Sequence, residues 1–192
     1  MSNRSSIKWS DVKKALAALD KAACLGLLQE LFKLSPQNRA FFAARFGSGA
    51  GEDLLGPFRK RMREPFYPRR GGFGSLKMDD ARSAVREYEK ATGDLRGTVD
   101  LMLDFVEAGS EFTHEFGDID AAFYDSLTGM LNRAIDRLRS PEGWRLVPEM
   151  HDRLVHVAKA VGDIGWGFSD HVKGEIQCLL EDYAARPGGG AA

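Results

Sequence analysis

The tripeptide Gly-Asp-Ile occurs twice in the C-terminal half of the chain, at residues 117–119 and 162–164. Both copies extend to the pattern G-D-I-x-x-x-F-x-D, and apolar positions on either side keep the same 45-residue offset, as Leu101 and Leu146 do. A period of this size is typical of stacked helix pairs, in which each pair buries an apolar face that it cannot cover alone. The sequence therefore predicts an internal repeat of two helix pairs.

Each Gly-Asp-Ile copy is expected to form the turn inside its helix pair. Glycine adopts the left-handed conformation past the end of a helix without the steric cost that a Cβ imposes. The aspartate is expected to accept backbone N–H bonds in the turn, and the isoleucine to fill the gap between the helices. In the second copy, aromatic residues pack against the corner and further glycines allow close approach. The predicted turn residues are Gly117, Asp118, Ile119, Gly162, Asp163, Ile164, Gly165, Trp166, Gly167 and Phe168.

The glycines of residues 162–168 do not fit a nucleotide-binding loop. A dinucleotide-binding fingerprint needs G-x-G-x-x-G directly after a strand, whereas Asp170 stands here at the third glycine position and a helical run precedes it. A phosphate-binding loop would need a lysine and then a serine or threonine directly after the glycines, and neither arrangement occurs here. The sequence therefore predicts a structural turn and no cofactor.

The rest of the chain also carries apolar residues at helical spacing. Asp20 and Ser35 are expected to cap helices, with Pro36 at the first position of the second one. Residues 51–64 are expected to form a further helix. No segment alternates apolar and polar residues for long enough to be a convincing strand.

Two more helices are expected before the first Gly-Asp-Ile copy. One follows Asp79 and ends at Gly93, and the next runs from about Leu95 to Gly109. The chain is therefore predicted to be all-α, with about seven to nine helices and a C-terminal half built as two stacked helix pairs.

Length and composition fit a single cytoplasmic domain. The 192 residues include 43% hydrophobic residues, and the net charge of −1 gives no global attraction to a polyanion or a membrane. The N-terminus lacks the apolar stretch of a signal peptide, and no apolar run approaches the roughly 20 residues that span a bilayer. Cys24 and Cys178 lie among aliphatic residues and are expected to be reduced. We expect residues 1–186 to form one domain, residues 187–192 to be a disordered tail, and no membrane partner.

Two stretches with acidic and histidine residues are candidates for a metal site. Glu111 and His114 form an E-x-x-H, which places a carboxylate and an imidazole on one helix face. Di-iron bundles use two such motifs and this chain has one, so exposed polar residues on amphipathic helices are the alternative. No nucleophile elbow occurs, and no catalytic motif is identified. The candidate ligands are Glu111, His114, Glu149, His151, Asp152 and His156.

Charge is unevenly distributed along the chain. Residues 56–74 carry six basic residues against one acidic residue, with aromatic residues between them, whereas residues 100–125 carry eight acidic residues and no Lys or Arg. The two segments are complementary to each other, within one chain or between copies. Alternatively, the basic segment meets an external anion such as single-stranded nucleic acid, or both segments are solvated faces. The predicted interaction residues are Arg59, Lys60, Arg61, Arg63, Phe66, Tyr67, Arg69 and Arg70.

Three stretches resemble a bacterial family of unknown function with EFT…GDI and GIGWGF motifs. They read FYPRRGGFGSLKMDDARSAVREYEKATG, EFTHEFGDIDAAFYDSL and DIGWGFSDHV, and the likeness covers roughly residues 10–185. This chain departs from the family pattern at His114 and Ser169. The GDIDAA turn also looks like that of tetratricopeptide repeats, although the period is nearer that of HEAT repeats. The resemblance implies a small cytoplasmic bacterial helical protein and brings no activity with it.

The functional hypotheses rest on these surfaces. A protein-binding or adaptor module is the first, with residues 58–73 as its surface and another protein, or a second copy of the chain, as its partner. Nucleic-acid binding through the same segment is the second. A metal-dependent enzyme that uses Glu111 and His114 is the third.

Overall fold

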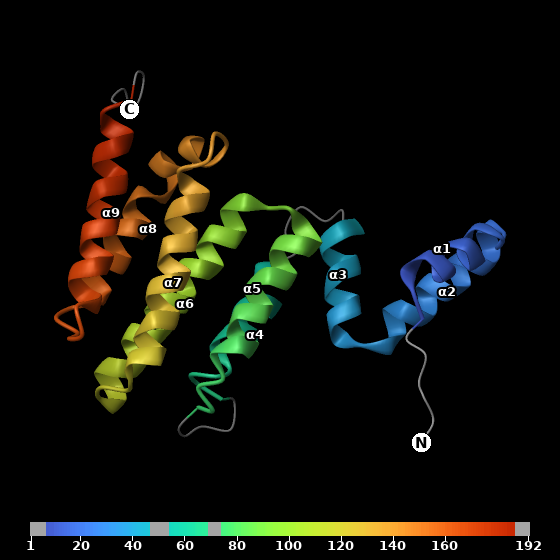
Figure 1. Ribbon diagram of the computed structural model, residues 1–192, viewed down its shortest axis with the longest axis horizontal. Coiled ribbons are helices and arrows are strands. Elements are labelled where there is room, and N and C mark those ends of the chain that lie inside the picture. The colour runs from blue at the N-terminus through green and yellow to red at the C-terminus, as the bar shows by residue number, and fades with distance from the viewer. Residues whose placement is uncertain (1–6, 47–53, 69–73, 187–192) are drawn as a thin grey trace. The chain divides into compact units, whose positions relative to one another are not determined.

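The computed structural model describes residues 7–46, 54–68 and 74–186, apart from the side chains at positions 36, 37, 40 and 44 (Figure 1). Within these ranges the chain is entirely helical, with nine α-helices and no strand, so the predicted all-α class is confirmed. The predicted tail, residues 187–192, lies outside them. The elements are α1 (Trp9–Ala17), α2 (Lys21–Leu34), α3 (Pro36–Phe46), α4 (Leu55–Arg63), α5 (Met78–Thr92), α6 (Leu95–Phe116), α7 (Ala121–Leu138), a 3₁₀ helix (Gly143–Arg145), α8 (Val147–Ala160) and α9 (Phe168–Ala184).

The chain divides into two compact units, Met1–Ser48 and Gly49–Ala192. The first unit holds α1 to α3, and the second holds α4 to α9. The predicted single domain over residues 1–186 stays a prediction, and each unit is described by itself.

Local sequence signals explain where several helices begin and end. The Asp20 carboxylate accepts a hydrogen bond from the Ala23 backbone N–H at 2.7 Å and so caps α2, as predicted. Ser35 accepts from the Asn38 N–H at 3.0 Å, ahead of Pro36 at the start of α3. Gly93 ends α5 in the left-handed conformation, with φ of 64°.

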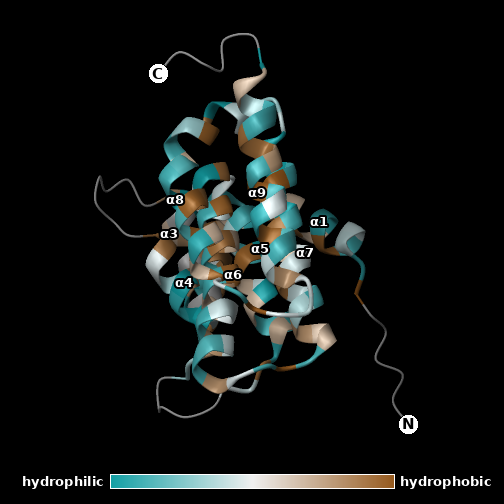
Figure 2. Cartoon of the chain, turned by 90° about the vertical axis from the view of Figure 1, so that its left-hand side faces the viewer, coloured by the Kyte–Doolittle hydropathy of each residue, from teal (hydrophilic) through white to brown (hydrophobic). Residues whose placement is uncertain are grey.

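The second unit is built around α6. This helix packs against α4, α5, α7 and α8, and residues 101–110 are all buried. The helices of this unit carry both teal and brown residues in Figure 2, the pattern of amphipathic helices that share a core. Helix α6 is therefore the structural axis of the unit.

Two helical hairpins form the C-terminal half of this unit. Helix α6 packs against α7 in the first hairpin, and α8 packs against α9 in the second. The hairpins stack in register, since α6 also contacts α8 and α7 also contacts α9, and Figure 1 shows these helices side by side. This is the predicted arrangement of two stacked helix pairs.

The predicted end of a helix near Gly109 is wrong. Helix α6 continues through this position to Phe116. A Cβ placed on Gly109 would lie 2.3 Å from Leu127 Cδ2, so the glycine is needed for the close approach of α7 and does not break the helix.

Candidate functional site

The two Gly-Asp-Ile copies lie at corresponding bends. Gly117 follows α6 with φ of 88°, and Gly162 follows α8 with φ of 56°, so both have the positive φ that the sequence predicts. Ile164 is buried, whereas Ile119 is half-buried.

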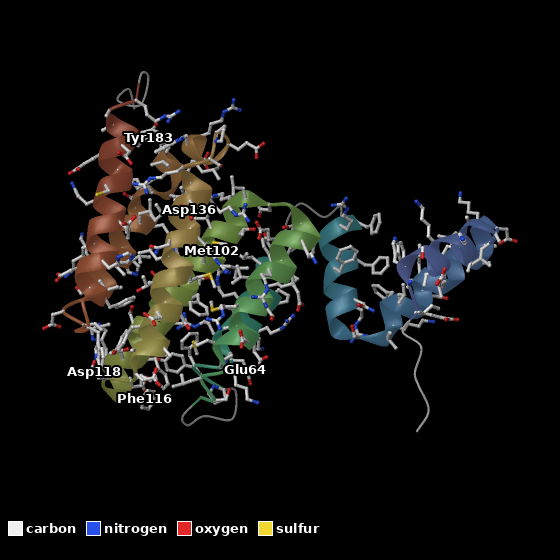
Figure 3. All side chains as sticks on the ribbon, in the orientation of Figure 1. Glu64, Met102, Phe116, Asp118, Asp136 and Tyr183 are labelled. Carbon is white, nitrogen blue, oxygen red and sulfur yellow. The ribbon has the colours of Figure 1, made fainter. Side chains whose placement is uncertain are left out.

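The aspartate of the first copy has a different role from the expected one. In the first turn it is Asp120, not Asp118, that caps the following helix, because its carboxylate accepts from the Phe123 N–H at 2.8 Å. Asp118 instead accepts a hydrogen bond from the Tyr124 hydroxyl at 2.9 Å. Figure 3 shows Phe116 and Asp118 together at this end of α6. The sequence G-D-I-D contains two aspartates, and either could cap the following helix. The sequence pattern alone therefore did not show that Asp120, and not Asp118, is the cap.

Side chains of α9 form hydrogen bonds to the second turn. The Gly162 carbonyl accepts hydrogen bonds from Ser169 Oγ at 2.7 Å and from Lys173 Nζ at 2.5 Å. Phe168 is buried, but Trp166 is 63% exposed and stacks on Tyr124 with a centroid distance of 6.3 Å. The Gly165 and Gly167 carbonyls accept from the backbone N–H groups of Phe168 and His171 at 3.1 and 3.0 Å. The glycine loop thus joins α8 to α9.

The basic arginines of α4 pair with carboxylates of their own chain. Arg59 binds Asp104 through Nε at 2.5 Å and Asp100 through Nη2 at 2.6 Å. Arg61 forms a two-point ion pair with Glu87 on α5, at 2.5 and 2.7 Å. The hydrogen bond from Arg61 holds the pKa of Glu87 below its ordinary value.

A further arginine completes this network from α8. Arg153 donates to Asp100 at 3.1 Å, to Asp104 at 2.7 Å and to Glu107 at 2.6 Å. The Asp104 and Glu107 side chains are only 9% exposed. Burial by itself lowers the pKa of Arg153, but the hydrogen bond to Glu107 and the nearby carboxylates outweigh it and raise the pKa overall. Sequence reasoning missed Arg153, because only the fold brings α8 beside α6.

The remaining residues of the basic segment are spread between core and surface. Arg63 pairs with Glu111, and its guanidinium lies 5.8 Å from the Tyr67 ring centroid. Phe66 is fully buried against Phe105. Lys60 is exposed, whereas Arg69 and Arg70 lie outside the described residues. The described arginines of this segment thus pair within the chain, which is one of the three arrangements that the charge pattern left open.

The candidate metal ligands are engaged separately. His114 Nε2 lies 3.1 Å from the Ala160 carbonyl oxygen, while Glu111 pairs with Arg63. Of the remaining four, Glu149 lies 3.7 Å from Arg96 and His156 lies 3.5 Å from Glu107. His151 Nδ1 lies 3.1 Å from Asp152 Oδ1, which is the one contact between two candidates among the ion pairs of the described residues. Over the described part of the chain, no three His, Cys, Asp or Glu side chains are grouped as a metal site would require.

A wide groove lies between α5 and α7. It has a volume of about 700 Å³ and an apolar floor that includes Met102 and Met130. Arg82 donates across it to Ser126 at 2.9 Å, and Arg137 pairs with Glu89. Its lining includes side chains of both signs, with Arg82, Arg86, Arg133 and Arg137 beside Glu89, Asp136 and Glu142.

The first unit presents an apolar surface that the sequence analysis did not single out. Helices α1 and α2 bury no residue, and large apolar side chains stay exposed along them, among them Trp9 at 69% and Leu25 at 56%. Between α2 and α3 lies an apolar groove with a volume of about 440 Å³. We call it the α2–α3 groove, and its lining residues are Leu25, Leu28, Gln29, Phe32, Phe41, Phe42 and Phe46. The signal that could have revealed it is the high share of apolar residues in α2, where six of the fourteen positions are leucine or phenylalanine.

In comparisons with known proteins, no family model, curated protein or solved structure matches the chain. The resemblance in the Gly-Asp-Ile and GWGF motifs therefore stays a prediction. Among the described residues, no helix combines the length and the apolar character needed to cross a bilayer.

Proposed function

We propose that this chain is a protein-binding module of the adaptor type, and that it binds its partner through the α2–α3 groove. The observation that carries the proposal is the apolar surface of the first unit, where α1 and α2 bury none of their residues.

Exposed apolar area on this scale is unusual for a surface that meets only water. Helix α2 carries Leu25, Leu27, Leu28, Leu31 and Phe32 within eight positions, and each is at least 38% exposed. Contiguous exposed apolar patches are typical of binding sites, because removing such area from water yields roughly 25 cal/mol per Å². A partner that covered this helix would bury its apolar residues.

The groove has the form of a site for a helix. Its walls are two helices that both contribute aromatic rings, since Phe32 of α2 and Phe42 of α3 are in edge-to-face contact with a centroid distance of 5.8 Å. An amphipathic helix places apolar side chains at i, i+3, i+4 and i+7 on one stripe, which fits such a groove. The leucine and phenylalanine walls supply complementary contacts without requiring hydrogen bonds.

The two other hypotheses have less support. Single-stranded nucleic acid would need free cations beside exposed rings, whereas Arg59, Arg61 and Arg63 are ion-paired. A metal-dependent enzyme would need ligands that converge, and Glu111 and His114 contact other groups.

The test uses a fluorescent 16-residue peptide with leucines at i, i+3, i+4 and i+7 and glutamines at most other positions. Anisotropy titrations with the full chain should show saturable binding. Leu28→Asp should weaken it at least tenfold, since burial of an unpaired carboxylate costs about 1.4 kcal/mol or more.

Leu34→Asp is the matched control. Leu34 lies on the same helix and is 76% exposed, but it does not line the groove. Binding should be unchanged in this variant. Equal effects of the two substitutions, or no binding by the unaltered chain, would contradict the proposal.

A further inference from the structure

We infer that the partner segment is an acidic amphipathic helix, about two turns of which enter the α2–α3 groove. This inference rests on the proposed function and specifies the chemistry of its partner. The carrying observation is the charge around the groove.

The two helices that form the groove are basic. Residues 21–46 contain Lys21, Lys33, Arg39 and Arg45 against a single acidic residue, Glu30. All five of these side chains are exposed. None of them makes an ion pair within the described part of the chain, where the ion pairs belong to the second unit.

Helical spacing places these charges relative to the groove. At 3.6 residues per turn, Lys21 falls about 30° from the centre of the row formed by the four lining residues of α2. Arg45 falls about 40° from the centre of the row that α3 contributes. Glu30 falls roughly 150° from the centre of the α2 row, on the opposite side of its helix. The groove is therefore flanked by cations, and Glu30, the one carboxylate within these two helices, lies on the far side of α2.

The same positive charge opposes the other occupants. A second copy would bring an identical basic rim against this one, and like charges placed together disfavour association. A helix with glutamates beside its apolar stripe would instead meet Lys21 at one end of the groove and Arg45 on its other wall. Apolar contact supplies affinity, and the charges select the partner and its orientation.

The length of the groove sets the length of the segment. The lining residues of α2 run from Leu25 to Phe32, which at 1.5 Å per residue spans about 10 Å, or two turns. The partner motif is therefore a pair of apolar anchors roughly seven residues apart, with one or two more between them.

The experiment compares three peptides with identical apolar anchors. Their remaining positions are mostly glutamate, glutamine or lysine, and each is titrated into the full chain by fluorescence anisotropy at low salt. We expect the glutamate peptide to bind at least tenfold tighter than the glutamine peptide, and the lysine peptide to bind weakest. The advantage of the glutamate peptide should shrink as salt is raised, because exposed charges are screened.

Charge-reversal variants test the residues themselves. The double substitution Lys21→Glu with Arg45→Glu should remove the preference for glutamate and leave the glutamine peptide bound within threefold of the unaltered chain. Lys90→Glu with Arg145→Glu makes the same change in net charge on exposed positions of the second unit and should leave the preference intact. Circular dichroism of each variant establishes that the helices are retained.

The possible outcomes distinguish the acidic partner from the proposed function. Equal binding of all three peptides would overturn the acidic partner and leave the proposed function standing. Absence of binding by all three would overturn both. A mass that doubles with concentration in sedimentation equilibrium would replace the acidic helix with a second copy. Co-sedimentation with vesicles of anionic phospholipid, in the absence of peptide binding, would replace it with a membrane surface.

Discussion

Two constraints favour glycine at position 162, namely its backbone conformation and the limited space around its Cα. Its φ is 56°, and a Cβ added there would lie 3.1 Å from His114 Cε1 on the neighbouring hairpin. L-residues other than glycine, asparagine and aspartate rarely adopt such a φ. The turn of the second helix pair therefore packs closely against His114, near the end of α6 in the first pair.

Gly162→Ala should lower the free energy of unfolding by roughly 1 kcal/mol or more. Urea denaturation followed by circular dichroism measures it. Gly129→Ala is the control, because Gly129 lies within α7 with nothing within 4 Å of its Cβ position. This second change should stabilise the chain by up to about 1 kcal/mol. A fully stable Gly162→Ala variant would show that the turn tolerates a side chain.

A second residue-scale prediction concerns the closest approach of two helices. Gly109→Ala places a methyl group against Leu127 and should destabilise by about 1–3 kcal/mol through overpacking. Leu127→Ala alone should also destabilise, because it leaves a cavity. The double variant should lose less than the sum of the two, since the added methyl fills part of that cavity. Additive losses in denaturation experiments would argue against direct contact between these positions.

At the scale of elements, ion pairs hold α4 and α8 to α6. Arg153 contacts three carboxylates of α6, two of which are almost buried. A buried charge pair contributes little relative to apolar packing, but removing one partner leaves the other uncompensated. This network is therefore better understood as fixing the position of α8 than as a source of net stability.

Arg153→Ala should cost about 3–5 kcal/mol, because Glu107 would stay almost buried without its arginine and Asp104 would keep only Arg59. Arg139→Ala removes an exposed ion pair with Asp182 in the same unit and should cost no more than about 1 kcal/mol. Thermal and urea unfolding of both variants measures the difference. Similar losses in the two would mean that Asp104 and Glu107 are hydrated in solution.

The ion pair between Arg61 and Glu87 predicts a dependence on pH. The hydrogen bond from Arg61 lowers the pKa of Glu87 below its ordinary value of 4.5. A lowered carboxyl pKa contributes stability above the ordinary value, and that contribution is lost as the pH falls through the folded-state pKa. Arg61→Gln should therefore be less stable than the unaltered chain at pH 7, and the gap should narrow below about pH 4.5. A gap that stays constant down to pH 2 would contradict this assignment.

At the scale of the whole molecule, the two units differ in how they are held together. The second unit has α6 at its centre, with residues 101–110 all buried. The first unit has no buried residue in α1 or α2. Short helices depend on tertiary packing for their stability, so the units are expected to open with different free energies.

Hydrogen exchange measured by mass spectrometry tests this difference in the full chain. Amides of α1 and α2 should exchange far faster than those of α6, which exchange through opening of the second unit. Addition of the glutamate peptide should slow exchange in α2 and α3 and leave α6 unchanged. Strong protection of α2 without any peptide would show that its apolar surface is already covered.

Periodic patterns made the fold class predictable. Apolar spacing, the cap residues Asp20 and Ser35, and the glycines at 93, 117 and 162 report on interactions within a few residues, which local sequence encodes directly. The 45-residue repeat predicted the stacked helix pairs, because a fixed period in sequence is typical of repeated structural units that pack against their neighbours. The error at Gly109 has the opposite origin, because a helical glycine that admits Leu127 looks the same in sequence as one that ends a helix.

Sequence by itself determined that this chain is helical, where most of its helices turn, and that one segment is basic and another acidic. Only the tertiary structure decided which charges meet, because Arg59 and Arg153 reach Asp104 across 45 and 49 residues of chain. The tertiary structure also decided which apolar residues remain exposed to solvent. Burial depends on which surfaces three-dimensional packing covers, and a leucine on α2 has the same local pattern as a leucine in the core.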